Sequence, residues 1–255
     1  MKTRIFITLL LICYTTLNWA QNRVTELRTW KFSHDSLHWQ TVNIPHDWAI
    51  SGPFDKKWDL QCVAIEQNGE KQATEKSGRS GALPWIGEGW YSHQLTIKNR
   101  KDFSHAYLCF DGAMSEPIVY INGKEAGRWA YGYNAFRIDA TKYLRKGENT
   151  IIVHLNNREE SSRWYPGAGL YRPVRLVLTP EMRIDPWNVY IRTTRLDDDG
   201  ATLSIDAKVD GWDSKKKLIA IAYGSADGQP EQTELTLDPL TGIAHAELKW
   251  KKGKY

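Results

Sequence analysis

Apolar and polar residues alternate along much of the second half of the chain. Residues 201–210 and 243–251 each place apolar side chains at every second position, with polar side chains between them. This period of two is typical of strands that have one buried and one wet face. Three other runs, 118–121, 151–155 and 174–178, are apolar on both faces, which favours central strands of a sandwich.

Turn residues separate these runs and support the same fold class. Asn122-Gly123 lies between two strand-like segments and predicts a two-residue hairpin. Only 139–144 has a helical pattern, and it is long enough for one or two turns. Long amphipathic helices are missing, so the pattern excludes alternating strand and helix units, including a TIM barrel within this chain. The sequence therefore predicts an all-β protein.

The strand spacing predicts two sandwich domains with a boundary near Thr179-Pro180. Residues 21–180 have irregularly spaced strands and long loops, among them a loop at 51–88 rich in glycine and proline. Residues 181–255 carry short strands at about 187–194, 201–210, 217–224, 232–237 and 243–251. That rhythm indicates an immunoglobulin-like sandwich, a fold that needs about 100 residues. We therefore expect the second domain to be truncated.

The first twenty residues have the pattern of a signal peptide. Lys2 and Arg4 precede an apolar stretch at 5–14, and Ala20 is a suitable cleavage position. The apolar stretch is too short to span a bilayer, and no other segment is apolar enough to do so. A lipid anchor on Cys13 is a weaker alternative, because bulky Ile12 precedes it. The pattern predicts a protein exported to the periplasm or secreted, with residues 1–20 removed.

Composition narrows the function without fixing it. The chain has 12 Trp and 12 Tyr, which either fill β-sandwich cores or stack against sugar rings. Its net charge of +4 is spread evenly, so we expect no nucleic-acid partner. Cys62 and Cys109 would remain after export, and whether they pair is open. No residues have metal-ligand spacing, and we expect no cofactor.

Five segments carry a family resemblance when taken in order. They are 42–48 (VNIPHDW), 87–91 (GEGWY), 110–113 (FDGA), 122–127 (NGKEAG) and 161–172 (SSRWYPGAGLYR). Their order and spacing resemble the N-terminal sugar-binding domain of glycoside hydrolase family 2 across about residues 28–178. This family contains bacterial β-galactosidases, β-glucuronidases and β-mannosidases.

The resemblance implies a jelly-roll domain, then an immunoglobulin-like domain, then a catalytic TIM barrel. It also implies retaining hydrolysis of a β-linked oligosaccharide or glycoside by two glutamates about 5–5.5 Å apart. In the family both glutamates lie on the barrel, one of them in an Asn-Glu pair. This chain has no Asn-Glu dipeptide, so we assign no catalytic residue to it. We expect the isolated chain to be inactive and the barrel to lie downstream.

The resemblance points to five substrate-binding candidates: Asp47, Trp48, Arg163, Trp164 and Tyr165. Asp47 either accepts hydrogen bonds from sugar hydroxyls or caps a turn, and Trp48 either lies near the sugar or fills the core. Arg163 offers a rigid fork of donors to a carboxylate or to hydroxyl oxygens. Its alternative is an ion pair at the domain seam, where Trp164 and Tyr165 would pack.

The identity of the sugar stays open at this point. The galactosidases with the best-known pattern place an acidic residue near the position of Arg163, in a loop one residue shorter. A β-glucuronidase- or β-mannosidase-type member is therefore an alternative. A stand-alone carbohydrate-binding module or lectin is another, because the jelly-roll fold is shared with such modules.

Overall fold

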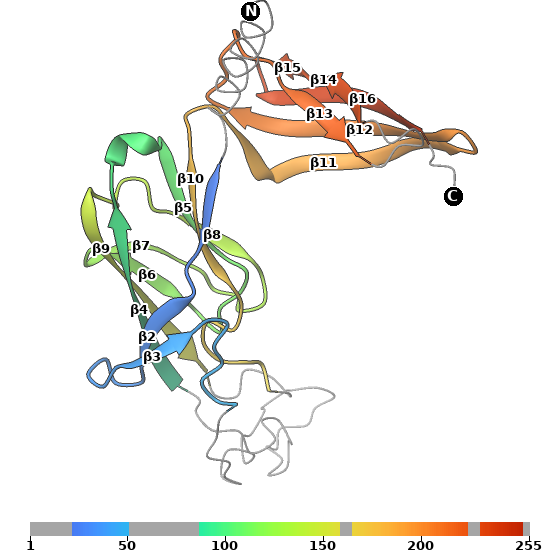
Figure 1. Cartoon of the computed structure of the whole chain (residues 1–255). Helices are drawn as coiled ribbons and strands as arrows, with labels where there is room; N and C mark the ends of the chain where they lie inside the picture. Colours follow the sequence, from blue (N-terminus) through green and yellow to red (C-terminus); the bar gives the residue numbers. More distant parts are fainter. Residues whose placement is uncertain (1–21, 51–86, 159–164, 224–229, 252–255) are drawn as a thin grey trace, which may run out of the picture. The chain divides into compact units, whose positions relative to one another are not determined.

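The computed structural model describes residues 22–50, 87–158, 165–223 and 230–251, which form two compact units (Figure 1). The first unit comprises Arg23–Leu178, and the second begins at Thr179. Within the described residues both units are built from antiparallel strands, and the one helical element is a short 3₁₀ helix, η2 (Arg100–Asp102). The described residues hold no helix of the length and apolar character needed to span a membrane. The predicted all-β class is confirmed.

Two facing sheets make the first unit a β-sandwich. The larger sheet has the order β3 (Gln40–Asn43), β2 (Thr29–Ser33), β4 (Gly87–Ile97), β9 (Gly147–Asn157), β6 (Ile118–Ile121), β7 (Lys124–Arg128). The smaller sheet has the order β1 (Arg23–Glu26), β10 (Val174–Thr179), β5 (His105–Phe110), β8 (Phe136–Asp139). The sequential neighbours β9 and β10 lie in opposite sheets, as expected for a jelly roll.

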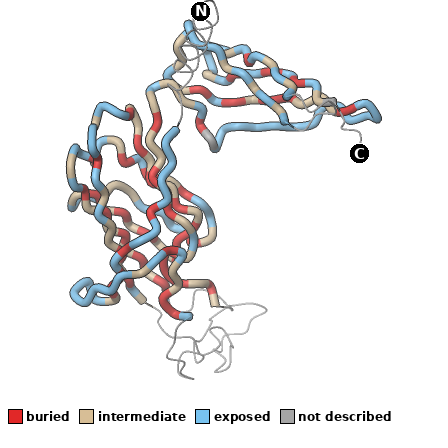
Figure 2. The backbone as a smooth tube through the Cα atoms, in the orientation of Figure 1, coloured by how far each residue is buried: buried red, intermediate tan, exposed pale blue. Residues whose placement is uncertain are grey.

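The core of this unit follows from the period of two along its strands. In β9, Ile151, Val153 and Leu155 are fully buried and alternate with half-buried residues (Figure 2). Large rings from both sheets fill the interior, and Phe110 stacks on Phe136 with centroids 4.6 Å apart. Burying one such side chain stabilises a fold by about 1.5–3 kcal/mol. The core therefore accounts for part of the aromatic excess in the sequence.

The predicted hairpin at Asn122-Gly123 joins β6 to β7. Both residues have left-handed backbone angles, with φ of 52° and 80°, as a tight hairpin turn requires. The side chain of Asn122 also donates to the carbonyl of Tyr143 and to Oδ1 of Asn149, both at 2.9 Å. At 139–144 the sequence predicts one or two helical turns, and the structure has a single turn that begins after Asp139 ends β8 (Phe136–Asp139). In that turn the Ala140 carbonyl accepts from two following amides.

The second unit has strands in the five predicted regions, with different limits, and the strand predicted at about 232–237 is divided into two strands that lie in different sheets. One sheet has the order β11 (Arg183–Asp197), β12 (Gly200–Asp210), β16 (Ile243–Lys251), β15 (Thr236–Asp238), and the other pairs β13 (Ile219–Ala222) with β14 (Glu231–Glu234). The buried side chains form one small aliphatic cluster, whose largest fully buried member is Leu248. The first strand is longer than predicted, because β11 begins at Arg183.

Candidate functional site

Two segments that are far apart in sequence meet at one end of the first sandwich. The chain leaving β3 runs through His46 and Asp47, and the chain approaching β10 runs through residues 165–170. The amide of His46 donates to the carbonyl of Leu170 at 2.8 Å. The described residues of the predicted site therefore lie together at this end.

Asp47 is the centre of this cluster. One carboxylate oxygen accepts from the amide of Ala49 at 3.0 Å and from the hydroxyl of Tyr165. The other accepts from the amide of Ala168 at 3.3 Å. Burial, followed by the hydrogen bond to Asp47, raises the pKa of Tyr165, so its hydroxyl stays protonated and donates. Asp47 thus connects the segment after β3 to the segment before β10 by hydrogen bonds. Both segments lie at the same end of the sandwich.

Trp48 occupies the core beneath this cluster. Its side chain is 5% exposed, and its ring stacks on Phe32 with centroids 5.5 Å apart. Gly89 permits this packing, since a Cβ there would lie 2.6 Å from the Trp48 ring. The structure therefore places Trp48 where its alternative interpretation, a core residue, would have it. A direct contact between Trp48 and substrate stays a prediction.

Arg163 and Trp164 lie outside the described residues. Tyr165, the third residue of that predicted run, is half-buried beside Asp47. The structure therefore brings together Asp47, Trp48 and Tyr165 from the five candidates. Substrate binding by any of the five stays a prediction.

A hydrogen-bonded pair of uncharged side chains, Tyr91 and His46, lies next to the Asp47 cluster. The sequence alone did not reveal this pair. The hydroxyl of Tyr91 and Nδ1 of His46 are hydrogen-bonded at 2.7 Å. Burial raises the pKa of Tyr91 and lowers the pKa of His46, so both stay uncharged near neutral pH. Gly169, with φ of 84°, lets the backbone pass so close that a Cβ would lie 2.2 Å from the Tyr91 hydroxyl. The Gly-Trp-Tyr and Gly-Ala-Gly motifs mark the segments that meet here, but neither motif indicates the contact between them.

Neither a metal centre nor a reactive thiol is evident where the chain is described. No group of three His, Cys, Asp or Glu side chains there could hold a metal ion. Cys109 is half-buried in β5, and burial raises the pKa of its thiol. Cys62 lies outside the described ranges, so its predicted alternatives stay open.

Comparison with known proteins identifies the class of this sandwich. Residues 29–180 match the family model described as "Glycosyl hydrolases family 2, sugar binding domain". A solved glycosyl hydrolase family 2 structure from Bacteroides cellulosilyticus has the same fold, with a TM-score of 0.71 at 23% identity, covering 91% of this chain and 31% of that one. The chain therefore belongs to glycosyl hydrolase family 2 and contains its sugar-binding domain.

Two relatives illustrate where in the family the chain lies. It is 33% identical to the β-galactosidase BoGH2A of Bacteroides ovatus, over 78% of this chain and 22% of that protein. It is 34% identical to a β-glucuronidase of Bacteroides fragilis, over 66% of this chain and 26% of that protein. The chain thus matches only a small N-terminal fraction of these glycosidases, as an accessory portion would.

Proposed function

We propose that this chain is the non-catalytic N-terminal portion of a retaining β-glycosidase that hydrolyses O-glycosidic bonds, with β-galactosides as substrates. The match of residues 29–180 to the sugar-binding domain of a glycosidase family carries this proposal. The bond-cleaving glutamates would lie in a TIM barrel that follows in the same polypeptide. The small share of each relative that the chain spans supports this division of labour.

The Asp47 cluster would form part of the rim of the catalytic pocket. Its hydrogen bonds fix Tyr165 and Ala168, which follow Arg163 and Trp164 in the sequence. A loop anchored on a hydrogen-bonded carboxylate can hold neighbouring side chains in a defined position, as substrate positioning requires. We infer that Asp47 anchors this rim and that Arg163 and Trp164 contact the sugar.

A β-glucuronidase is the second candidate activity. The relatives from Bacteroides ovatus and Bacteroides fragilis are 33% and 34% identical to this chain, so identity does not separate galactoside from glucuronide. The pattern at residues 1–20 also leads us to propose that the protein is exported to the periplasm or secreted. Residues 1–20 lie outside the described part of the chain.

A substrate panel on the polypeptide that includes the downstream barrel tests this proposal. Aryl β-galactoside should be cleaved faster than the glucuronide, glucoside and mannoside. Arg163→Ala should lower kcat/KM at least about tenfold while leaving the melting temperature nearly unchanged, since one lost charged contact in the transition state is worth about 1.4 kcal/mol or more. Lys101→Ala, at an exposed position of the first unit, is the matched control and should leave kcat/KM unaltered. Unchanged kinetics in Arg163→Ala would assign that residue a structural role.

A further inference from the structure

We propose that a groove on the outer face of the six-stranded sheet binds a neutral pyranose ring of a β-linked glycan. The proposal rests on the proposed function, because it assumes that the chain serves an enzyme acting on β-glycosides. The groove has a volume of about 590 Å³ and lies over β6, β9 and the segment that follows β7. This volume falls within the range of about 300–1,000 Å³ that is typical of small-molecule sites.

One wall of the groove consists of two exposed aromatic rings. Trp129 is 40% exposed and Tyr131 is 56% exposed, although such rings gain stability when they are buried. Trp129 lies parallel to the core residue Phe136, with centroids 5.8 Å apart, so the core holds the indole plane in place. Exposed rings with a fixed orientation offer flat apolar faces to the C–H side of a sugar.

Hydrogen bonds to the backbone make this wall rigid. The amide of Trp129 donates to the carbonyl of Pro117 at 3.0 Å. Directly after Tyr131, the carbonyl of Gly132 accepts from the hydroxyl of Tyr171 at 2.9 Å. A binding surface that is ordered before the ligand arrives loses less entropy on binding.

Polar groups of three kinds surround the rings. The carboxylate of Glu116 accepts from Nε of Arg158 at 2.9 Å, which fixes its orientation. The guanidinium of Arg128 donates through Nε and Nη2 to Glu125, and its Nη1 makes no hydrogen bond to a described residue. Carboxylate, guanidinium and amide groups together can accept from and donate to neighbouring hydroxyls of one sugar ring.

The amide belongs to Asn156, whose backbone is fixed on both sides. Its N–H donates to the carbonyl of Ser115 at 2.8 Å, and its carbonyl accepts from the Ser115 hydroxyl at 2.5 Å. The side-chain amide has no hydrogen-bond partner among the described residues. Ile118 and His154 form the floor, and the His154 ring stacks on Trp90 with centroids 4.7 Å apart. The groove therefore combines a flat apolar surface with few, oriented polar groups.

The charges in the groove favour a neutral sugar. Glu116 is paired with Arg158, and Arg128 is paired with Glu125, so each charge already has a counter-ion. A uronate placed there would lose its hydration without gaining an ion pair, since neither guanidinium lacks a counter-ion. The ligand class is therefore a neutral pyranoside.

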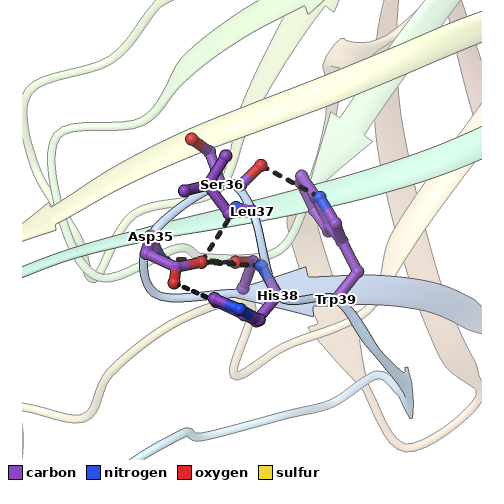
Figure 3. Close-up of polar contacts among 6 residues, drawn as sticks. Asp35, Ser36, Leu37, His38 and Trp39 are labelled. Atoms are coloured by element: carbon purple, nitrogen blue, oxygen red, sulfur yellow. Dashed lines mark hydrogen bonds and ion pairs between the residues drawn. The ribbon is translucent and has the colours of Figure 1, made fainter.

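A second groove in the same unit provides a matched control. It has a volume of about 620 Å³ and is lined by Trp39, Lys31 and Gln94 among others, with no carboxylate. Trp39 is 37% exposed, close to the exposure of Trp129. Its indole N–H donates to the carbonyl of Ser36 at 3.0 Å, inside the loop between β2 and β3 (Figure 3). Removal of Trp39 thus deletes an equally exposed indole outside the proposed site.

An NMR titration of the ¹⁵N-labelled chain tests the proposal. The three ligands are methyl β-D-galactopyranoside, methyl β-D-glucopyranoside and methyl β-D-glucuronide. We expect saturable shifts of the Trp129 indole signal with at least one neutral sugar, a Kd of about 1–10 mM, and weaker binding of the glucuronide. Trp129→Ala and Tyr131→Ala should each weaken binding at least about tenfold, a loss of about 1.4 kcal/mol. Tyr131→Ala is informative even if Trp129→Ala disturbs the core, because Tyr131 lies outside it. Trp39→Ala should bind as the parent chain does.

Three results would overturn the site. They are no saturable binding of either neutral sugar, a Kd that Tyr131→Ala leaves unchanged, or binding that Trp39→Ala abolishes. The assay measures binding by the isolated chain, whereas the proposed function is measured as hydrolysis in the presence of the barrel. A negative binding result would therefore overturn the proposed groove without overturning the proposed function, and a negative hydrolysis result would do the reverse.

Discussion

The two units cover the inward faces of their sheets to different extents. In the first unit, Tyr91, Val153 and Val119 form a cross-strand row over β4, β9 and β6, and all three are fully buried. In the second unit, Ile205 on β12 is 8% exposed, while its partner Ile191 on β11 is 58% exposed. The pattern of alternation is the same in both rows. Burial differs because, within the described residues, β13 and β14 pack against β16, and Ile205 belongs to the resulting buried cluster whereas Ile191 does not.

This difference shows that a strand pattern determines which side chains share a face but does not determine whether that face is covered. The stability of the first unit should therefore depend on its core of aromatic rings. The second should depend on the smaller aliphatic cluster around Leu248. The predictions below test this contrast, from the largest expected effect to the smallest.

Phe110→Ala should destabilise the first unit most. Phe110 is fully buried and stacked on Phe136, so its removal leaves a cavity that costs about 3–5 kcal/mol of unfolding free energy. Urea unfolding followed by NMR signals of each unit should show a loss confined to the first. An equal loss in the second unit would mean that the two unfold together.

Ile205→Ala and Ile191→Ala compare the same substitution on two strands of one row. Ile205→Ala should lower the unfolding free energy of the second unit by about 2–4 kcal/mol. Ile191→Ala should lower it by less than about 1 kcal/mol, because that side chain is already in water. Equal costs in calorimetry would show that β11 is covered in solution.

Gly169→Ala and Gly123→Ala separate steric crowding from backbone conformation. Both glycines have left-handed φ angles, 84° and 80°. A Cβ at Gly169 would meet the Tyr91 hydroxyl and the His46 carbonyl, whereas a Cβ at Gly123 would meet nothing within 4 Å. We expect a cost of about 1 kcal/mol at Gly123 and more than about 2 kcal/mol at Gly169. Similar melting temperatures for the two variants would argue against the close approach at Gly169.

The first unit should lose stability in mild acid before the second does. Burial lowers the pKa of His34, His46 and His93 below the ordinary value of 6.5. Below about pH 6.5 the unfolded chain therefore binds protons that the folded unit does not, and stability falls as the pH drops toward the lowered pKa values. Urea titrations between pH 8 and pH 5 should show a declining midpoint for the first unit.

Two other groups provide controls for this titration. The pKa of His38 is raised by its hydrogen bond to Asp35 in the exposed loop of Figure 3, so its contribution is present below pH 6.5 and is lost as the pH rises. His38→Asn removes this opposing effect and should steepen the decline of the urea midpoint.

In the second unit, hydrogen bonds from Leu240 and Thr241 lower the pKa of Asp238, whose contribution to stability is lost only below pH 3.8. A flat midpoint for the first unit would contradict the burial of its imidazoles.

Much of the fold could be predicted because its signals are local. Alternation located β12 and β16, and Asn122-Gly123 located a hairpin whose left-handed angles few other pairs adopt. The pattern at 139–144 left one or two helical turns open, and only one forms because the first residue, Asp139, ends β8. Local patterns are weakest in such short connecting segments.

The site was predictable only in part because its contacts are long-range. Asp47 and Tyr165 are 118 positions apart, and their hydrogen bond depends on how β3 and β10 are placed in the sandwich. The family motifs selected both residues but gave no sign of the bond between them. The support from Tyr91 and His46 was likewise invisible, because a buried tyrosine after Gly-Trp has the same local pattern as any core residue. Sequence patterns identify such residues, and packing determines what they contact.

The central claim is that this chain shapes a glycosidase pocket and leaves bond cleavage to residues outside it. The most direct test measures the hydrolysis of an aryl β-galactoside by two proteins. One is residues 1–255 alone, and the other is the polypeptide that includes the proposed downstream barrel. We predict no turnover above background for the chain alone and clear turnover when the barrel is present. Turnover by the chain alone that a carboxylate-to-amide substitution within residues 21–255 abolishes would contradict the account.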